Sequence, residues 1–310
     1  MSVALEGDQL RLVDGSLWVV KGCHHPLDGV VAVPRIFEGR KLKRLHEARE
    51  IISRYYRHYE RFLPEFGRAV PVVPHNAILE YLTALTAFEK IVKGSSRLYD
   101  VALELAELLS ECGLKCGLSG SLLGGYHTAT SDIDLVCVET GLSSYDCLKS
   151  LRELGLIKNI TAAEAVEESA AVGELLPGVM HEELLMNKLT QGTFKEVKYT
   201  LRVVDCSSEE GVLGPYHHTR REHVLVKLLN TTYKTPAVYD VELLRPHLHE
   251  GLKAYLLTYR ARLTELPSGT VIKADGLLHL DLERRFVLVS LDDPESVIES
   301  LTTCRPLNRA

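Results

Sequence analysis

The feature that most constrains this chain is a Gly-Ser turn followed by two aspartates on a strand. Residues 114–118 are a short apolar run, and Gly120-Ser121 opens a turn of glycines and small residues. Residues 132–138 are mostly apolar and partly β-branched, which predicts a second strand. Because side chains i and i+2 of a strand share a face, Asp132 and Asp134 should project together.

This combination predicts a site for a metal ion and a phosphate. Two adjacent carboxylates repel each other unless a cation lies between them, and magnesium prefers oxygen ligands. A tight turn at Gly120-Ser121 presents backbone N–H groups to a phosphate. Ser131, directly before the aspartates, is the other candidate for ligand binding in this loop. A solvated pair of acids at a strand entrance is the alternative.

The motif resembles the signature of the DNA polymerase β-type nucleotidyltransferase superfamily. Gly-Ser, a gap of ten residues from Leu122 to Ser131, and Asp-x-Asp follow one another as in that superfamily. A broader resemblance to an archaeal family of predicted nucleotidyltransferases covers most of the chain. It rests on Val19-Val20-Lys21-Gly22, His25-Pro26, Val33-Pro34-Arg35, residues 120–126 and residues 234–240.

The resemblance implies transfer of a nucleoside monophosphate from a nucleoside triphosphate such as ATP, with two Mg²⁺ or Mn²⁺ ions. Asp132 and Asp134 would bind both ions, and Gly120 and Ser121 would hold the terminal phosphates. A third carboxylate is expected on a later strand. Asp205, at the end of the apolar run 194–206, fits by type and order, and Asp240 is its rival. A strand-end acid facing water is the alternative for Asp205.

Composition limits the possible classes of fold and function but does not choose among them. The 310 residues can hold two domains, and a 45% apolar fraction is ordinary for a globular chain. The net charge of −6 shows that the chain as a whole is not basic, so its overall charge does not indicate nucleic-acid binding. Neither a signal peptide nor an apolar run long enough to cross a membrane is visible, so we expect a cytoplasmic protein. The two glutamines in the whole chain point weakly to a thermophile.

The seven cysteines are odd in number and scattered, which predicts no disulfide framework. Cys112 and Cys116 are close enough in sequence for a metal or a local bridge. Because no matching Cys/His pair lies near them, we expect two buried or free thiols instead.

A basic segment at residues 35–68 is the candidate contact for a nucleic-acid acceptor. It holds ten basic and five acidic residues, and its apolar residues fall at helical spacing. Arg54, Arg57 and Arg61 would lie on the outer side of such a helix. They would either follow an RNA backbone or form a solvated face paired with glutamates.

The remaining patterns predict an alternation of helices and strands. Arg220 and Lys227 lie near the third acid and are candidates to bind the triphosphate. The expected strands are short runs within 9–36, 114–118, 132–138, 194–206 and 268–292. The expected helices are two within 76–112, and 143–154, 162–171, 181–190, 222–229, 242–264 and 294–301.

Together these readings predict an α/β fold, a small mixed sheet flanked by helices, with β-containing N- and C-terminal appendages. The expected divisions are 1–70 (β plus basic helix), 71–265 (the transferase-like core) and 266–310 (a β-hairpin and helix). The expected function is a metal-dependent nucleotidyltransferase acting on RNA, a small molecule or a protein hydroxyl. The alternative is a non-catalytic nucleotide- or RNA-binding protein with the same fold.

Overall fold

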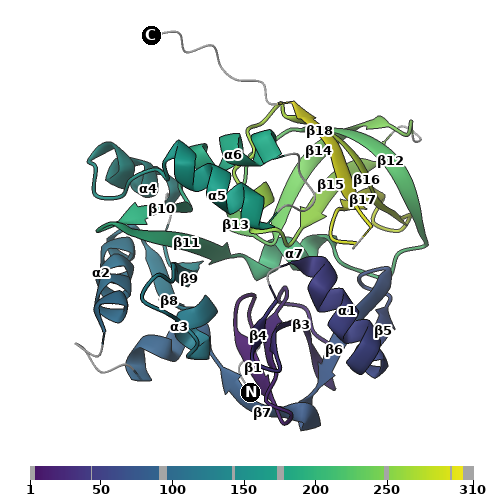
Figure 1. Ribbon diagram of the computed structural model, residues 1–310. Helices are drawn as coiled ribbons and strands as arrows, with labels where there is room; N and C mark the ends of the chain where they lie inside the picture. Colours follow the sequence, from purple (N-terminus) through teal and green to yellow (C-terminus); the bar gives the residue numbers. More distant parts are fainter. Residues whose placement is uncertain are drawn as a thin grey trace.

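The computed structural model describes residues 4–42, 44–90, 96–141, 144–172, 178–247, 251–293 and 295–302. The chain is sheet-rich, with 40% strand and 29% helix, and its described strands form three sheets, one of them closed into a barrel. The predicted α/β fold, a small mixed sheet flanked by helices, is therefore wrong. Figure 1 shows the N-terminal sheet in purple, the middle sheet with its helices in teal, and the barrel in green and yellow.

The N-terminal sheet has the described strand order β5-β6-β3-β2-β1-β7, with β4 paired to β3. Trp18 is fully buried at its centre and packs edge-on against Tyr56 and Tyr59. The strands are β1 Gln9–Leu12, β2 Leu17–Val20, β3 Gly29–Phe37, β4 Arg40–Lys41, β5 Glu60–Leu63, β6 Arg68–Pro74 and β7 Ile78–Leu82, with helix α1 Leu45–Tyr55. Short 3₁₀ turns lie at Arg57–Tyr59, His75–Ala77 and Ala84–Lys90.

The middle sheet carries the Asp-x-Asp motif. Its described order is β10-β11-β9-β8, with β13 added to β11; β9 and β11 run parallel, whereas β8 and β9 are antiparallel. The strands are β8 Leu114–Leu118, β9 Ile133–Glu139, β10 Gln191–Phe194, β11 Val197–Val204 and β13 Lys234–Thr235. The helices are α2 Arg97–Glu111, α3 Gly120–Gly124, α4 Ser144–Glu153, α5 Ala162–Val172, α6 Gly178–Asn187 and α7 Cys206–Val212.

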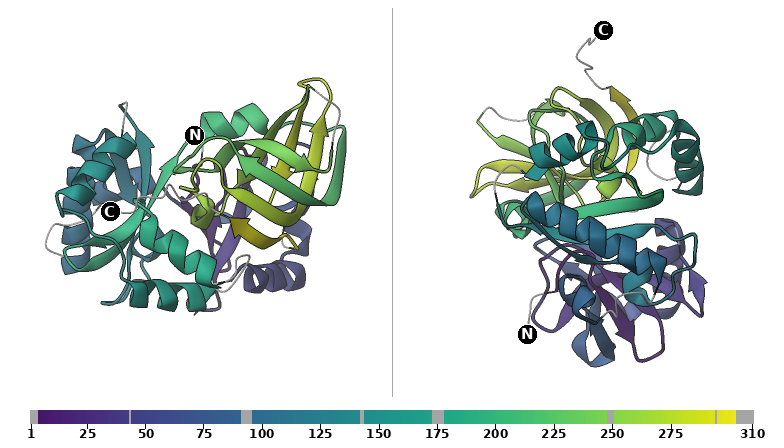
Figure 2. Two further views of the ribbon diagram at one scale, coloured as in Figure 1. Left: turned by 90° about the horizontal axis from the view of Figure 1, so that it is seen from above. Right: turned by 90° about the vertical axis from the view of Figure 1, so that its left-hand side faces the viewer.

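One face of the middle sheet forms the largest core. Ile133, Leu135, Tyr199 and Leu201 point to this face, where they pack against α2 and α4. The side chains of β9 and β11 that alternate with them point to the opposite face, beside the N-terminal sheet. Figure 2 shows the middle sheet and its helices on one side of the molecule and the barrel on the other.

The third sheet closes because β12 pairs with both β14 and β16. The ring of described strands runs β12-β14-β15-β17-β16 and back to β12, and β18 extends it from β16. Such closure leaves no unpaired edge within the ring. The strands are β12 His218–Leu228, β14 Ala237–Arg245, β15 Lys253–Thr258, β16 Val271–Asp281, β17 Phe286–Ser290 and β18 Val297–Thr302, and a 3₁₀ turn lies at Ala261–Leu263.

Several predicted helices belong to this barrel. Residues 222–229 lie in β12, where Val224, Val226 and Leu228 are buried with the period of two that marks a strand. The described parts of 242–264 and 294–301 are mainly β14, β15 and β18; Leu248 and Pro294 lie outside the described residues. Leucines spaced near four residues fit a helix as well as two strands joined by a turn, so the predicted helices at 222–229, 242–264 and 294–301 are wrong.

Other local predictions are confirmed. Strands at 114–118, within 194–206 and within 268–292 are present, as are helices at 144–153 and 162–172. The basic segment is helical only to Tyr55; Arg57 begins a 3₁₀ turn and Arg61 lies in β5, so the long basic helix does not form. Residues 76–90 form strand β7 and 3₁₀ turns instead of a helix. No helix among the described residues is long and apolar enough to cross a membrane.

The expectations of no disulfide framework and of two thiols at Cys112 and Cys116 are wrong. Six cysteines pair as Cys23–Cys206, Cys112–Cys147 and Cys116–Cys137. Cys304 lies outside the described residues. Cys116 and Cys137 face each other on neighbouring strands, and Cys23–Cys206 joins the N-terminal sheet to α7. Sequence spacing alone could not find these pairs, because each joins residues that only the folded sheets bring together.

Removal of these bridges should cost stability in the order of the loops they close. Cys23–Cys206 spans 183 residues and Cys112–Cys147 spans 35. Chain entropy predicts that Cys23→Ala with Cys206→Ala lowers the unfolding free energy by about 1.4 kcal/mol more than the other double replacement. Reversible urea unfolding of the two double variants measures the difference. Equal losses would show that the loop-length argument does not apply.

Candidate functional site

The Gly-Ser turn is held directly against the second aspartate of the motif. Gly120 has a φ of +54°, and a β-carbon built on it would overlap the Asp134 carboxylate. The Ser119 backbone N–H donates to the Asp134 carbonyl at 2.8 Å, which fixes the turn to β9. Glycine at position 120 therefore allows a backbone conformation and a close approach that no other residue would. Ser121 is buried inside α3.

Asp132 and Asp134 stand together at the start of β9. Burial and the neighbouring Asp134 charge raise the pKa of Asp132 to about 6. Burial also raises the pKa of Asp134, while Arg202, Arg35 and Lys41 act in the opposite direction. Ser131 stabilises the preceding turn, where its hydroxyl accepts a hydrogen bond from the Thr128 N–H at 2.9 Å.

Asp205 does not join this pair. The parallel register places Thr200 opposite Asp134 and Tyr199 opposite Ile133. Asp205 follows five residues after Thr200, about 16 Å farther along the strand direction. It also follows the phase of Tyr199, which faces the core and not the aspartates. The expected cluster of three carboxylates therefore does not form.

Asp205 has a structural explanation instead. It is the N-cap of α7, where its carboxylate accepts hydrogen bonds from the backbone and hydroxyl of Ser208 and from the Ser207 hydroxyl. Lys234 Nζ lies 3.2 Å from its Oδ2 and 2.7 Å from Glu139. Although burial alone would raise the pKa of Asp205, these contacts lower it to about 2. Capping and ion pairing account for this residue.

The other sequence candidates also lie away from the aspartates. Arg220 and Lys227 are exposed on β12 of the barrel, where Arg220 pairs with Glu222. The rival acid Asp240 is exposed on β14 and accepts a hydrogen bond from Asn230. None of the three is brought to the Gly-Ser turn, because residues that the sequence analysis read as helix and loop form barrel strands.

Basic and neutral side chains occupy the place expected for the third acid. Lys198, Thr200 and Arg202 alternate on the β11 face that lies beside Asp132 and Asp134. No three His, Cys, Asp or Glu side chains in the described part of the chain are grouped to hold a metal ion. The neighbours of Asp132 and Asp134 include the acid Glu168 as well as cations on β11 and the N-terminal sheet. The β11 face beside the aspartates has no carboxylate, so it does not provide the third acidic ligand that a two-metal centre of the expected kind would use.

The N-terminal sheet contributes to the site, which the sequence analysis missed. Gln9 Nε2 donates to the Gly120 carbonyl at 2.6 Å, and the charges of Arg35 and Lys41 partly oppose the rise that burial causes in the pKa of Asp134. Lys41 also lies 5.6 Å from the Tyr126 ring centroid. Arg35 is the last residue of the Val33-Pro34-Arg35 motif, on which the family resemblance partly rests. The sequence thus pointed to this residue, but no role was predicted for it.

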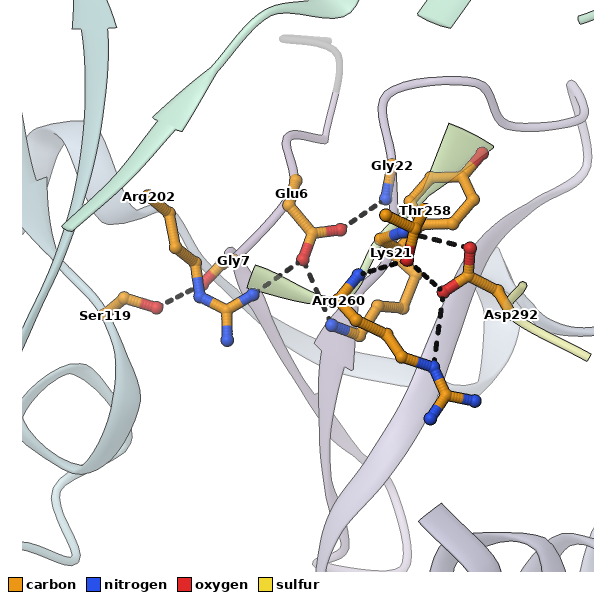
Figure 3. Close-up of polar contacts among 10 residues, drawn as sticks. Glu6, Gly7, Lys21, Gly22, Ser119, Arg202, Thr258, Arg260 and Asp292 are labelled. Carbon is orange, nitrogen blue, oxygen red and sulfur yellow. Dashed lines mark hydrogen bonds and ion pairs between the residues drawn. The ribbon is translucent and has the colours of Figure 1, made fainter. Parts of the chain in front are cut away.

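A buried carboxylate joins Arg202 to the N-terminal sheet. Glu6 is fully buried, and its Oε1 lies 3.0 Å from Lys21 Nζ and 2.9 Å from Arg202 Nη1. Its other oxygen accepts from the Gly22 N–H at 2.5 Å. Figure 3 shows this contact beside the barrel pair Arg260–Asp292, and it shows the Ser119 hydroxyl bonded to the Gly7 carbonyl.

The three arginines proposed for RNA contact do not lie on one helix. Arg54 lies in the last turn of α1, and Arg57 begins a 3₁₀ turn. Arg61 lies on β5 and forms a two-bond ion pair with Asp28, at 2.6 and 2.9 Å. An RNA contact through these residues remains a prediction.

Comparison with protein-family models, with curated proteins and with solved structures finds no significant match to this chain.

The contact between Gly120 and Asp134 can be tested with two glycines of similar backbone conformation. Gly125 has a φ of +74° and open space around its β-position. Gly125→Ala should cost about 1 kcal/mol of unfolding free energy from left-handed strain alone. Gly120→Ala should cost at least about 2 kcal/mol more, measured by urea unfolding.

In a chain that already carries Asp134→Ala, the Gly120→Ala substitution should lose most of its extra cost in unfolding free energy, because the overlapping carboxylate is gone. Equal costs for the two glycine variants in the natural background would contradict the close approach.

The raised pKa of Asp132 predicts a loss of stability with rising pH. Between about pH 4 and 6 the folded chain keeps a proton that the unfolded chain releases, so unfolding free energy falls over this window. Asp132→Asn removes this effect. The unfolding free energy of Asp132→Asn relative to that of the natural chain should therefore increase with pH. The increase has an upper limit of about 3 kcal/mol, which solvent screening of the partly buried Asp132 reduces. Thermal unfolding across this range measures it, and a constant difference would contradict the raised pKa.

Proposed function

We propose that this chain binds a nucleoside triphosphate at the Gly120-Ser121 turn and retains it without nucleotidyl transfer. The likeness of the Gly-Ser and Asp-x-Asp motifs to nucleotidyltransferases supports a nucleotide as the ligand. The turn of small residues and the cations around it support recognition of the phosphates.

The observation that carries the absence of transfer is the composition of β11 beside the aspartates. Two-metal phosphoryl chemistry needs carboxylates that hold the ion which activates the attacking oxygen. Lys198, Thr200 and Arg202 occupy that strand face, while Asp205 caps α7 at the far end. A lysine and an arginine can bind a phosphate, but neither can replace an anionic metal ligand.

The metal-dependent nucleotidyltransferase is the second candidate. It is favoured by the adjacency of Asp132 and Asp134, whose mutual repulsion would be relieved by a cation. The two candidates differ in the fate of the α-phosphate, which a transferase moves to an acceptor and a binding protein leaves in the nucleotide.

The location of binding can be tested by amide hydrogen exchange with ATP, using adenosine and inorganic phosphate as comparison ligands. We expect saturable protection of residues 118–126 with ATP and little with adenosine, because the phosphates provide most of the contacts. Protection confined to the barrel, or no saturable binding, would refute the proposed site.

The absence of transfer can be tested with α-labelled ATP, Mg²⁺ or Mn²⁺, and total RNA or protein extract. We expect the label to remain in the nucleotide. Transfer that disappears in Asp134→Asn would instead establish the transferase. The matched control is Asp205→Ala, which should leave ATP binding within about two-fold because Asp205 lies about 16 Å along the sheet from the pair.

A further inference from the structure

We infer that Gln9 is a positioning residue for the proposed phosphate site, because its buried side-chain amide contacts both ends of α3 and holds the Gly-Ser turn in the form that binds phosphate. This inference rests on the proposed nucleotide-binding function and names the residue that organises its site. Gln9 lies on β1 of the N-terminal sheet, 111 positions before Gly120 in sequence. Its side chain is fully buried, so the amide is a fixed part of the surroundings of the turn.

The alternation of side chains along β1 explains why Gln9 reaches the turn. Leu10 and Leu12 point into the core of the N-terminal sheet. Gln9 alternates with them and therefore points to the opposite face, where its Nε2 donates to the Gly120 carbonyl at 2.6 Å. The residue that reaches the turn is thus fixed by the same period that builds the core of this sheet.

Neighbouring contacts hold the same two segments together. The Ser119 hydroxyl donates to the Gly7 carbonyl at 2.7 Å (Figure 3). Arg11 Nη2 lies 3.5 Å from the Gly124 carbonyl at the other end of α3. Contacts therefore recur at every second residue from Gly7 to Arg11, and Gln9 is the middle one.

The other end of the Gln9 amide packs against Gly124. A β-carbon built on Gly124 would lie 2.6 Å from Gln9 Oε1 and 2.5 Å from the Tyr126 ring, so only glycine allows this approach. Among the residues that the structure describes, none donates a hydrogen bond to this buried oxygen. An unsatisfied buried oxygen costs free energy and offsets the gain from the Gly120 hydrogen bond. The amide therefore adds little to stability, which favours a role in positioning.

The hydrogen bond to the Gly120 carbonyl also acts on the Ser121 N–H, because both groups belong to one peptide unit. A donor at the carbonyl oxygen polarises the peptide and strengthens its N–H as a donor. Ser121 lies in the first turn of α3, where an N–H has no acceptor within the helix. The bond from Gln9 also fixes the plane of this peptide, so its N–H keeps one direction. Gln9 thus strengthens phosphate binding without adding charge.

Equilibrium dialysis of labelled ATP with Mg²⁺ tests this role. Gln9→Met keeps the length of the side chain and removes the donor. It should weaken ATP binding about three- to ten-fold, the effect of one neutral hydrogen bond. The matched control Tyr56→Phe removes a buried hydrogen bond to Asp14 on the other face of the same sheet, and it should leave the dissociation constant unchanged.

The outcomes separate this inference from the proposed function. Absence of ATP binding by the natural chain would refute the proposed function. Binding by the natural chain that Gln9→Met leaves unchanged would overturn only the role of Gln9. Equal losses in Gln9→Met and Tyr56→Phe would also overturn that role, because general loosening of the N-terminal sheet would then explain both.

Gln9→Glu gives a second readout, in which protonation restores the donor. The ionised carboxyl cannot donate to the Gly120 carbonyl, whereas the protonated carboxyl can, and burial raises its pKa. The ratio of the dissociation constant of this variant to that of the natural chain should fall at least about three-fold between about pH 8 and about pH 5.5. A ratio that does not change with pH would overturn the inference, provided that melting temperatures show folded chains.

Hydrogen exchange of the natural chain tests the same coupling without a substitution. If docking of β1 supports ATP binding, ATP binding supports docking of β1 by the same factor. Saturating ATP should therefore slow amide exchange in residues 9–12 and 17–20 at least about three-fold. Unchanged exchange in these two strands with ATP bound would overturn the inference.

Discussion

The parallel register between β9 and β11 decides what this site can do. Pairing of Thr200 with Asp134 places Lys198 and Arg202 on the aspartate face and sends Asp205 to the other end of the sheet. A shift by one residue would exchange these side chains for the core residues Tyr199 and Leu201. The chemistry of the site is therefore fixed by the same alternation that builds the largest core of the protein.

The N-terminal sheet belongs to the same physical unit as the aspartates. Gln9 bonds the Gly-Ser turn, Gly7 accepts from Ser119, and Glu6 pairs with Arg202 across the sheet boundary. Each of these contacts joins residues more than one hundred positions apart in sequence. Burial of Glu6 would be costly without Lys21 and Arg202, so both cations stabilise this junction.

The sequence was sufficient to predict the local structure of the Gly-Ser and Asp-x-Asp motif, but it was not sufficient to predict which other residues lie around that motif. The strand, the Gly-Ser turn and the alternation of Asp132 and Asp134 follow from periodicity and glycine chemistry. The barrel was missed because leucines in 242–264 fit two periods equally well, and closure of β12 onto β16 is a non-local pairing. Asp205 was misplaced because strand order and register, which sequence periodicity does not encode, determine which acids meet. Arg35 was recognised within a motif but received no role, since only packing between two sheets brings it to Asp134.

The buried Glu6 carboxylate also limits how this chain can change in evolution. Replacement of Arg202 by an acid, the simplest way to provide a third metal ligand on β11, would leave Glu6 facing Lys21 alone and would add a new charge beside Asp134. Several kilocalories per mole of unfavourable burial would oppose that step, on the order of those for other broken buried ion pairs. A route to metal-dependent catalysis would therefore have to alter the N-terminal segment and β11 together, which makes the present charge arrangement resistant to single substitutions.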